Sequence, residues 1–190
     1  MREAGVADFP APAVDRREVA RYALCPDEGR IPLLDEVIAE GLAETAYRVC
    51  WQTFPVALTE NGVDLGFGKT PSRDLARALL GCEKCVVFVA TAGAGPDRLA
   101  QKYARLSPAK AQLFQAFGAE RVEALCDAFC REFGREIALR PRFSPGYGDL
   151  PLSFQRAIFA ALRPERAVGV SLNGALLMTP TKSVSAIAGF

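Results

Sequence analysis

The sequence predicts an α+β fold, a single domain with a mainly antiparallel sheet flanked by helices. Segments of helical period and short β-branched runs alternate without the regular strand–helix–strand order of a doubly wound sheet. Two Asn-Gly pairs, at 61–62 and 173–174, separate extended segments and predict hairpins, which join antiparallel strands. The 190 residues, 50% of them apolar, suit one domain over 1–190 with a sizeable core.

The N-terminal quarter is expected to hold a flexible start followed by two helices. Residues 1–14 are mostly small or polar, so we expect them to be flexible. Asp15 is a favourable N-cap residue for a helix over 16–24, which the segment CPDEGR at 25–30 ends. A second helix is predicted over 35–49, where apolar residues recur at close to helical spacing.

The next segments predict a hairpin, a short helix and a buried strand. Aromatic and branched residues over 51–58 indicate a strand, and the Asn-Gly turn returns the chain through 63–67. Ser72 is an N-cap candidate for a helix that ends at Gly81. The run 85–90 is apolar without interruption, which suits a strand covered on both faces.

The second half is dominated by one long helix. A stripe of apolar residues with helical period predicts this helix over 108–133. A loop rich in proline and glycine then covers 140–151. The other predicted elements are helices over 97–106 and 154–162, a hairpin through 167–180 and a final strand over 183–190.

Composition excludes several classes of function. The chain has no histidine, which excludes nucleophiles activated by histidine, zinc or haem ligated by histidine, and imidazole acid–base chemistry. A net charge of +1 without a basic patch argues against nucleic-acid partners, and no apolar stretch is long enough to suggest a membrane span. The polar start shows no signal-peptide pattern, so we expect a cytoplasmic protein with reduced thiols.

The six cysteines leave an alternative open. Cys82 and Cys85 have the CxxC spacing of redox and zinc sites, and Cys126 and Cys130 could supply two further ligands from one helix. Cysteine is also a common small core residue, and Cys126 lies on the apolar stripe of the long helix. We favour structural thiols and no metal, with a thiol or zinc protein as the alternative.

The loop Arg142-Phe-Ser-Pro-Gly-Tyr147 is the most specific motif in the chain. Proline stiffens the backbone and glycine permits a close ligand approach, while Arg142 offers a forked donor that suits a carboxylate. Glu123 lies at the border of the apolar stripe, where it could face a cleft, and Asp127 one turn on has the same position.

Three segments together resemble a known family. RFSPGY matches the Arg-x-x-x-Gly-Tyr motif of the activation (reactivation) domain of cobalamin-dependent methionine synthase, and LLMTPTKSVSA at 176–186 is similar to its Met-x-Pro-x-x-Ser-Val-Ser-Gly segment. ERVEALCDAF at 120–129 is similar to the family's acidic helix. The match covers 110–190 and is closer to free-standing subunits than to the fused enzymes, although Ala186 replaces a glycine and Thr179 a bulky aromatic.

The resemblance implies roles for individual residues in binding S-adenosylmethionine. Arg142 would meet the ligand's carboxylate, and Glu123 its amino or ribose groups. Adenosine would lie on Gly146 and the backbone near Ser144, with Tyr147 beside it. The residues implied to face a corrinoid partner are Pro180, Lys182 and Ser183.

The implied activity is support of the reductive methylation that reactivates oxidised cobalamin. The cobalamin belongs to the partner, a cobalamin-dependent methionine synthase or related corrinoid protein of methionine biosynthesis, and a flavodoxin-type donor supplies the electron. This chain would act as one component of that methyltransferase. It needs no catalytic residue of its own, because methyl transfer to cobalt requires alignment and no general base. The rival interpretation is a non-catalytic docking module for a corrinoid protein.

Overall fold

The centre of the fold is a four-stranded antiparallel sheet. The computed structural model describes residues 3–25 and 31–190. Its strands β1 (Ala4–Asp8), β2 (Arg48–Pro55), β6 (Lys84–Thr91) and β9 (Ser183–Gly189) lie in the order β1-β2-β6-β9. Residues 85–91 of β6 are buried on both faces, as the uninterrupted apolar run predicts. The α+β fold with a mainly antiparallel sheet is confirmed.

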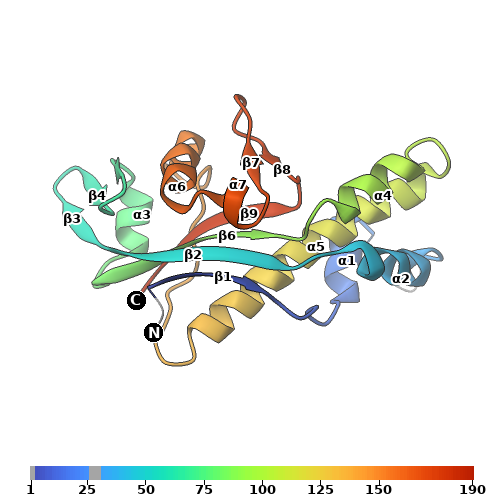
Figure 1. Cartoon of the computed structure of the whole chain (residues 1–190), viewed down its shortest axis with the longest axis horizontal. Helices are drawn as coiled ribbons and strands as arrows, with labels where there is room; N and C mark the ends of the chain where they lie inside the picture. Colours follow the sequence, from blue (N-terminus) through green and yellow to red (C-terminus); the bar gives the residue numbers. More distant parts are fainter. Residues whose placement is uncertain (1–2, 26–30) are drawn as a thin grey trace.

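Short elements cover one face of this sheet, drawn above it in Figure 1. Their apolar side chains form a core with Val87 and Val89 of β6 and Ile187 of β9. The elements are α3 (Arg73–Ala78), η2 (Leu152–Phe154), α6 (Gln155–Leu162), α7 (Pro164–Ala167), the small sheet of β3 (Ala57–Thr59), β4 (Gly62–Asp64) and β5 (Lys69–Thr70), and the hairpin of β7 (Ser171–Leu172) and β8 (Met178–Thr179). Both predicted Asn-Gly hairpins are confirmed, between β3 and β4 and between β7 and β8.

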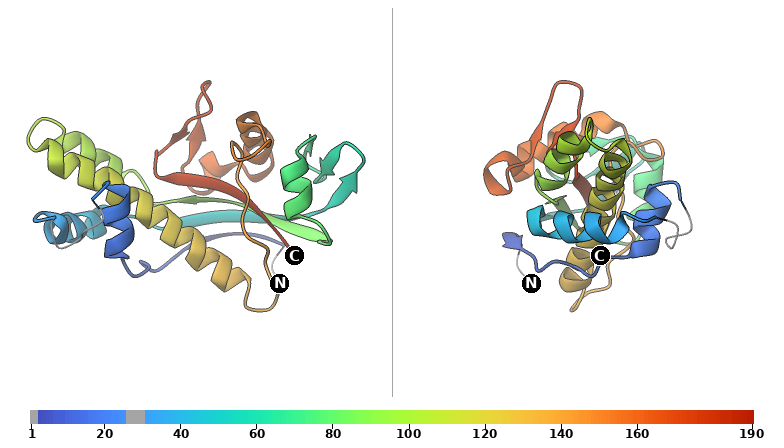
Figure 2. Two further views of the ribbon diagram at one scale, coloured as in Figure 1. Left: turned by 180° about the vertical axis from the view of Figure 1, so that it is seen from behind. Right: turned by 90° about the vertical axis from the view of Figure 1, so that its right-hand side faces the viewer.

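The long helix α5 (Pro108–Phe133) covers the opposite face. Its C-terminal half packs on the sheet, where the ring centroids of Phe129 and Phe88 lie 4.7 Å apart. Its N-terminal half continues past the end of the sheet, as Figures 1 and 2 show. There it packs with the helices α1 (Arg16–Tyr22), α2 (Leu34–Glu44) and α4 (Gly95–Tyr103) around a separate core.

The two predicted N-caps, at the starts of α1 and α3, are confirmed, and the structure adds a third at the start of α5. The side chains of Asp15, Ser72 and Ser107 each accept a hydrogen bond from the first turn of the helix that follows. The break predicted at 25–30 falls mostly outside the described residues. No helix within the described parts of the chain is long and apolar enough to cross a membrane.

The expectation of a flexible start is wrong for residues 4–8, which form β1. This strand pairs with the free edge of β2 from Ala4 opposite Gln52 to Asp8 opposite Arg48. Gly5 lies against the Trp51 ring, and a Cβ atom at residue 5 would come within 2.4 Å of it. Packing against Trp51 thus requires glycine at position 5.

The predicted helix over 35–49 is too long, because α2 ends at Glu44. Thr45 adopts an extended conformation, and residues from Arg48 onward belong to β2. Tyr47 and Val49 are both buried under α5. Their spacing of two is that of a strand. The error arose because Val49 also follows Leu42 and Ala46 at helical spacing.

Candidate functional site

The loop that carries Arg142 lies along the outer edge of β9. The N–H groups of Phe143 and Ile187 each donate to the carbonyl oxygen of the other at 2.8 Å, and Arg140 N donates to Gly189 O at 2.8 Å. This pairing fixes the backbone on both sides of Arg142. The loop therefore has little freedom to move relative to the sheet.

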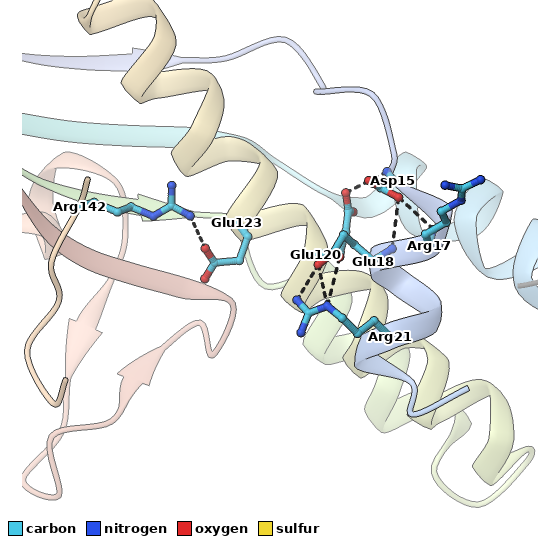
Figure 3. Close-up of polar contacts among 7 residues, drawn as sticks. All are labelled: Asp15, Arg17, Glu18, Arg21, Glu120, Glu123 and Arg142. Carbon is cyan, nitrogen blue, oxygen red and sulfur yellow. Dashed lines mark hydrogen bonds and ion pairs between the residues drawn. The ribbon is translucent and has the colours of Figure 1, made fainter. Parts of the chain in front are cut away.

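Arg142 reaches from this edge to two carboxylates of α5. Its Nη2 donates to Glu123 Oε2 at 2.6 Å, shown in Figure 3, and its Nη1 donates to Asp127 Oδ1. The exposed fractions of the three side chains are 26% for Arg142, 40% for Glu123 and 55% for Asp127. Burial works against the charged guanidinium, but the hydrogen bonds to Asp127 and Glu123 outweigh it and raise the pKa of Arg142 above its ordinary value. The cluster carries two negative charges around one positive charge.

The Ser144–Tyr147 segment, which follows Arg142 in the chain, forms a tight turn. Tyr147 N donates to Ser144 O at 3.2 Å, and Gly146 N donates to Leu150 O at 2.9 Å. Gly146 has φ +94°, a conformation that favours glycine. The Tyr147 side chain remains 70% exposed. The turn thus presents an aromatic ring to solvent from a fixed backbone.

Asp149 attaches this turn to the start of α3. Its carboxylate accepts from Ser72 Oγ at 2.5 Å and from the Arg73 backbone N–H at 2.8 Å. The hydrogen bond from Ser72 is the main cause that lowers the pKa of Asp149 below its ordinary value. Both ends of the Gly-Tyr turn are consequently held, one by β9 and the other by α3.

Two cavities of opposite charge meet at Asp127 and Arg131. The acidic cavity, of about 330 Å³, lies between α1 and α5 and is lined by Pro12, Ala13, Asp15, Glu18, Tyr22, Glu120, Glu123, Ala124, Asp127 and Arg131. The basic cavity, of about 580 Å³, is lined by Asp127, Cys130, Arg131, Gly134, Ile137, Ala138, Leu139, Arg140, Pro141 and Arg142. A zwitterionic ligand can place its cationic end in the first cavity and its anionic end in the second.

A buried ion pair on α5 closes the acidic cavity. Arg121 is 0% exposed and Glu120 is 3% exposed, and they bind each other. Arg121 also donates to Pro12 O at 2.6 Å and Ala13 O at 2.9 Å. Glu120 accepts from Asp15 N at 3.0 Å (Figure 3). These bonds hold the N-terminal segment across α5 next to the candidate site.

Sequence reasoning missed this pair, although the pattern contains a signal for it. Arg121 lies four residues from both Phe117 and Leu125, two buried positions of the apolar stripe. An arginine on such a stripe needs a buried partner, which the adjacent Glu120 supplies.

The three residues implied to face a corrinoid partner lie on the short connection before and at the start of β9. Ser183 is buried, and its hydroxyl bonds to Pro180 O at 2.8 Å and to Thr91 Oγ1 at 2.9 Å. Lys182 Nζ donates to Gln115 Oε1 on α5 at 2.7 Å, and burial lowers the pKa of this amine. Four residues of extended strand separate Ser183 from Ile187, about 13 Å, so this segment lies apart from Arg142 along the same strand.

The four-cysteine alternative is wrong, because the sheet separates the two pairs. Cys85 is buried in the core beside α3, whereas Cys126 is buried in the core beneath α5. Burial raises the pKa of the Cys85 thiol to about 12, which keeps it protonated. No group of three or more His, Cys, Asp or Glu side chains within residues 3–25 and 31–190 is placed to hold a metal ion.

Comparison with known proteins identifies the fold. No model of a protein family matches the sequence, and no curated protein matches it. Among solved structures, the chain is similar to the MetH reactivation domain bound to AdoHcy, with a TM-score of 0.72 and 13% sequence identity over 98% of this chain and 78% of that one. The chain therefore has the fold of the MetH reactivation domain, as the resemblance in the Arg142 loop predicts.

Proposed function

We propose that this chain binds S-adenosylmethionine and supports the reductive methylation of cobalamin held by a cobalamin-dependent methionine synthase or a related corrinoid protein. The observation that carries the proposal is the arrangement of Arg142 beside Glu123 and next to the anchored Gly146-Tyr147 turn. It occurs in a fold shared with a domain bound to AdoHcy, the compound that remains when S-adenosylmethionine has lost its methyl group.

The proposed binding mode assigns one end of the ligand to each part of the site. Arg142 pairs with the ligand's carboxylate and Glu123 with its amino group, in line with the opposite charges of the two adjoining cavities. Adenosine lies along Gly146 and the backbone at Ser144, where the exposed Tyr147 ring is available for stacking.

The chain's contribution to the reaction is positioning. In the proposed reaction a methyl group leaves the sulfonium of S-adenosylmethionine and passes to cobalt on the partner, after a flavodoxin-type donor has supplied one electron. The rigid backbone around Arg142 and Gly146 would fix the sulfonium, and alignment of this kind accounts for catalysis without a general base. Pro180, Lys182 and Ser183 are proposed to lie toward the corrinoid partner, with Ser183 acting through the backbone that it holds. We place the protein in the cytoplasm, as a single S-adenosylmethionine-binding domain.

Titration calorimetry with S-adenosylmethionine tests the proposal. We expect saturable binding by the wild-type chain and at least a tenfold loss of affinity in Arg142→Ala. Arg142→Lys should lose part of the affinity, because lysine keeps the positive charge but lacks the guanidinium group that can form two parallel hydrogen bonds to a carboxylate. Arg135→Ala is the matched control, since Arg135 is an exposed arginine that pairs with Glu132. Absence of binding by the wild-type chain would refute the proposal.

One observation favours the rival function, a docking module for a corrinoid protein that has lost the small ligand. Arg142 already has two carboxylate partners within the chain, so it is satisfied without a ligand. This interpretation requires that the wild-type chain bind the corrinoid protein but not S-adenosylmethionine, so the same titration separates the two functions.

A further inference from the structure

We propose that the Asp127 carboxylate binds the Arg142 guanidinium in the free protein. It lowers the affinity for the ligand because it competes with the ligand's carboxylate for this guanidinium. The inference rests on the proposed function, because it concerns the same binding site. It assigns a role to a side chain that borders both cavities.

The geometry makes Asp127 the partner that a ligand displaces. The two Nη groups of Arg142 each donate to a different carboxylate of α5. A ligand carboxylate that binds both Nη groups in bidentate fashion competes with these two carboxylates for them. Asp127 is 55% exposed and Glu123 is 40% exposed, so the Asp127 carboxylate regains water more easily on release. Glu123 stays in place and faces the ligand's amino group.

Charge supports the same conclusion. With Glu123 and Asp127 beside Arg142, the cluster has a net charge of −1, and a ligand carboxylate would be a third negative group at one guanidinium. Repulsion between groups at contact distance is strong, whereas the long-range attraction of an acidic side chain for a cationic ligand is screened by salt. Removal of the Asp127 charge should therefore strengthen binding of a ligand that carries a carboxylate.

Two ligands and one charge-neutralising variant test this competition. We expect Asp127→Asn to bind S-adenosylmethionine about three- to tenfold more tightly than the wild-type chain. Its affinity for decarboxylated S-adenosylmethionine, which keeps the sulfonium and the amine, should stay within a factor of two of the wild-type value. Glu132→Gln is the matched control, because it removes an acid from the same helix that pairs with Arg135 instead of Arg142.

The outcomes separate this inference from the proposed function. The competition would be overturned if Asp127→Asn bound S-adenosylmethionine no more tightly than the wild-type chain does. It would also be overturned if the substitution tightened binding of S-adenosylmethionine and of decarboxylated S-adenosylmethionine equally. Both results would leave the binding function in place. Absence of binding by both the wild-type chain and Asp127→Asn would overturn both proposals. Thermal unfolding of the variant checks that it is folded, which we expect because Asp127 is half exposed.

Discussion

Phe143 and Ile187 pair through both of their main-chain groups, and this register decides where Arg142 points. Phe143 and Ile187 pack into the core on the α3 and α6 side of the sheet. Because successive side chains of an extended segment alternate between faces, Arg142 points to the other side, where α5 lies. A shift of one residue would turn Arg142 away from Glu123. The edge of β9 is thus the element that aligns the candidate binding residues.

Gly146→Ala should destabilise the protein by about 1–2 kcal/mol, because its φ of +94° disfavours a side chain. A Cβ atom there would also lie 3.3 Å from Leu152 Cδ1. Urea unfolding measures the loss. Gly174→Ala is the control, since a Cβ atom at Gly174 meets nothing within 4 Å. An equal effect of the two substitutions would show that the turn tolerates a side chain.

Local signals in the sequence were enough to predict much of this fold. The N-caps Asp15 and Ser72 act within a few residues of the helices that they begin, and the Asn-Gly turns are equally local. Strand β1 could not be predicted in this way, because its pairing partners lie 40 to 48 residues away in β2. The early end of α2 was missed because Val49 fits both the helical spacing from Leu42 and Ala46 and the strand alternation with Tyr47.

The candidate site was predictable only in part. Arg142 and Glu123 were identified through a family resemblance, and in the structure Arg142 Nη2 lies 2.6 Å from Glu123 Oε2. Asp127 had an ambiguous position from spacing alone, since only the register of the loop on β9 shows that it reaches Arg142. The position of Arg121 on the apolar stripe signals that it is buried, but the Pro12 and Ala13 carbonyl groups that it binds lie more than a hundred residues away in the chain.

Asp149→Ala should lower the melting temperature at neutral pH, because it removes the bonds that join the Gly-Tyr turn to α3. The pKa of Asp149 is lowered in the folded state, so its stabilising effect is present above its ordinary pKa of 3.8 and is lost as the pH falls through the folded value. The difference in melting temperature between wild type and variant should therefore shrink from pH 7 to pH 3. A difference that stays constant over this range would contradict the assigned role of the charge.

The buried pair of Glu120 and Arg121 should behave as a unit in a double-mutant cycle. Arg121→Met leaves the Glu120 carboxylate buried without its cation, and it also removes the donors to Pro12 and Ala13. We expect a loss of about 3–5 kcal/mol in the free energy of unfolding. Combining Arg121→Met with Glu120→Gln removes both charges and should cost less than the sum of the two single substitutions, since no unpaired charge remains. Urea unfolding of the four proteins gives the coupling energy. Additive losses would mean that the two side chains stabilise the crossing of the N-terminal segment independently of each other.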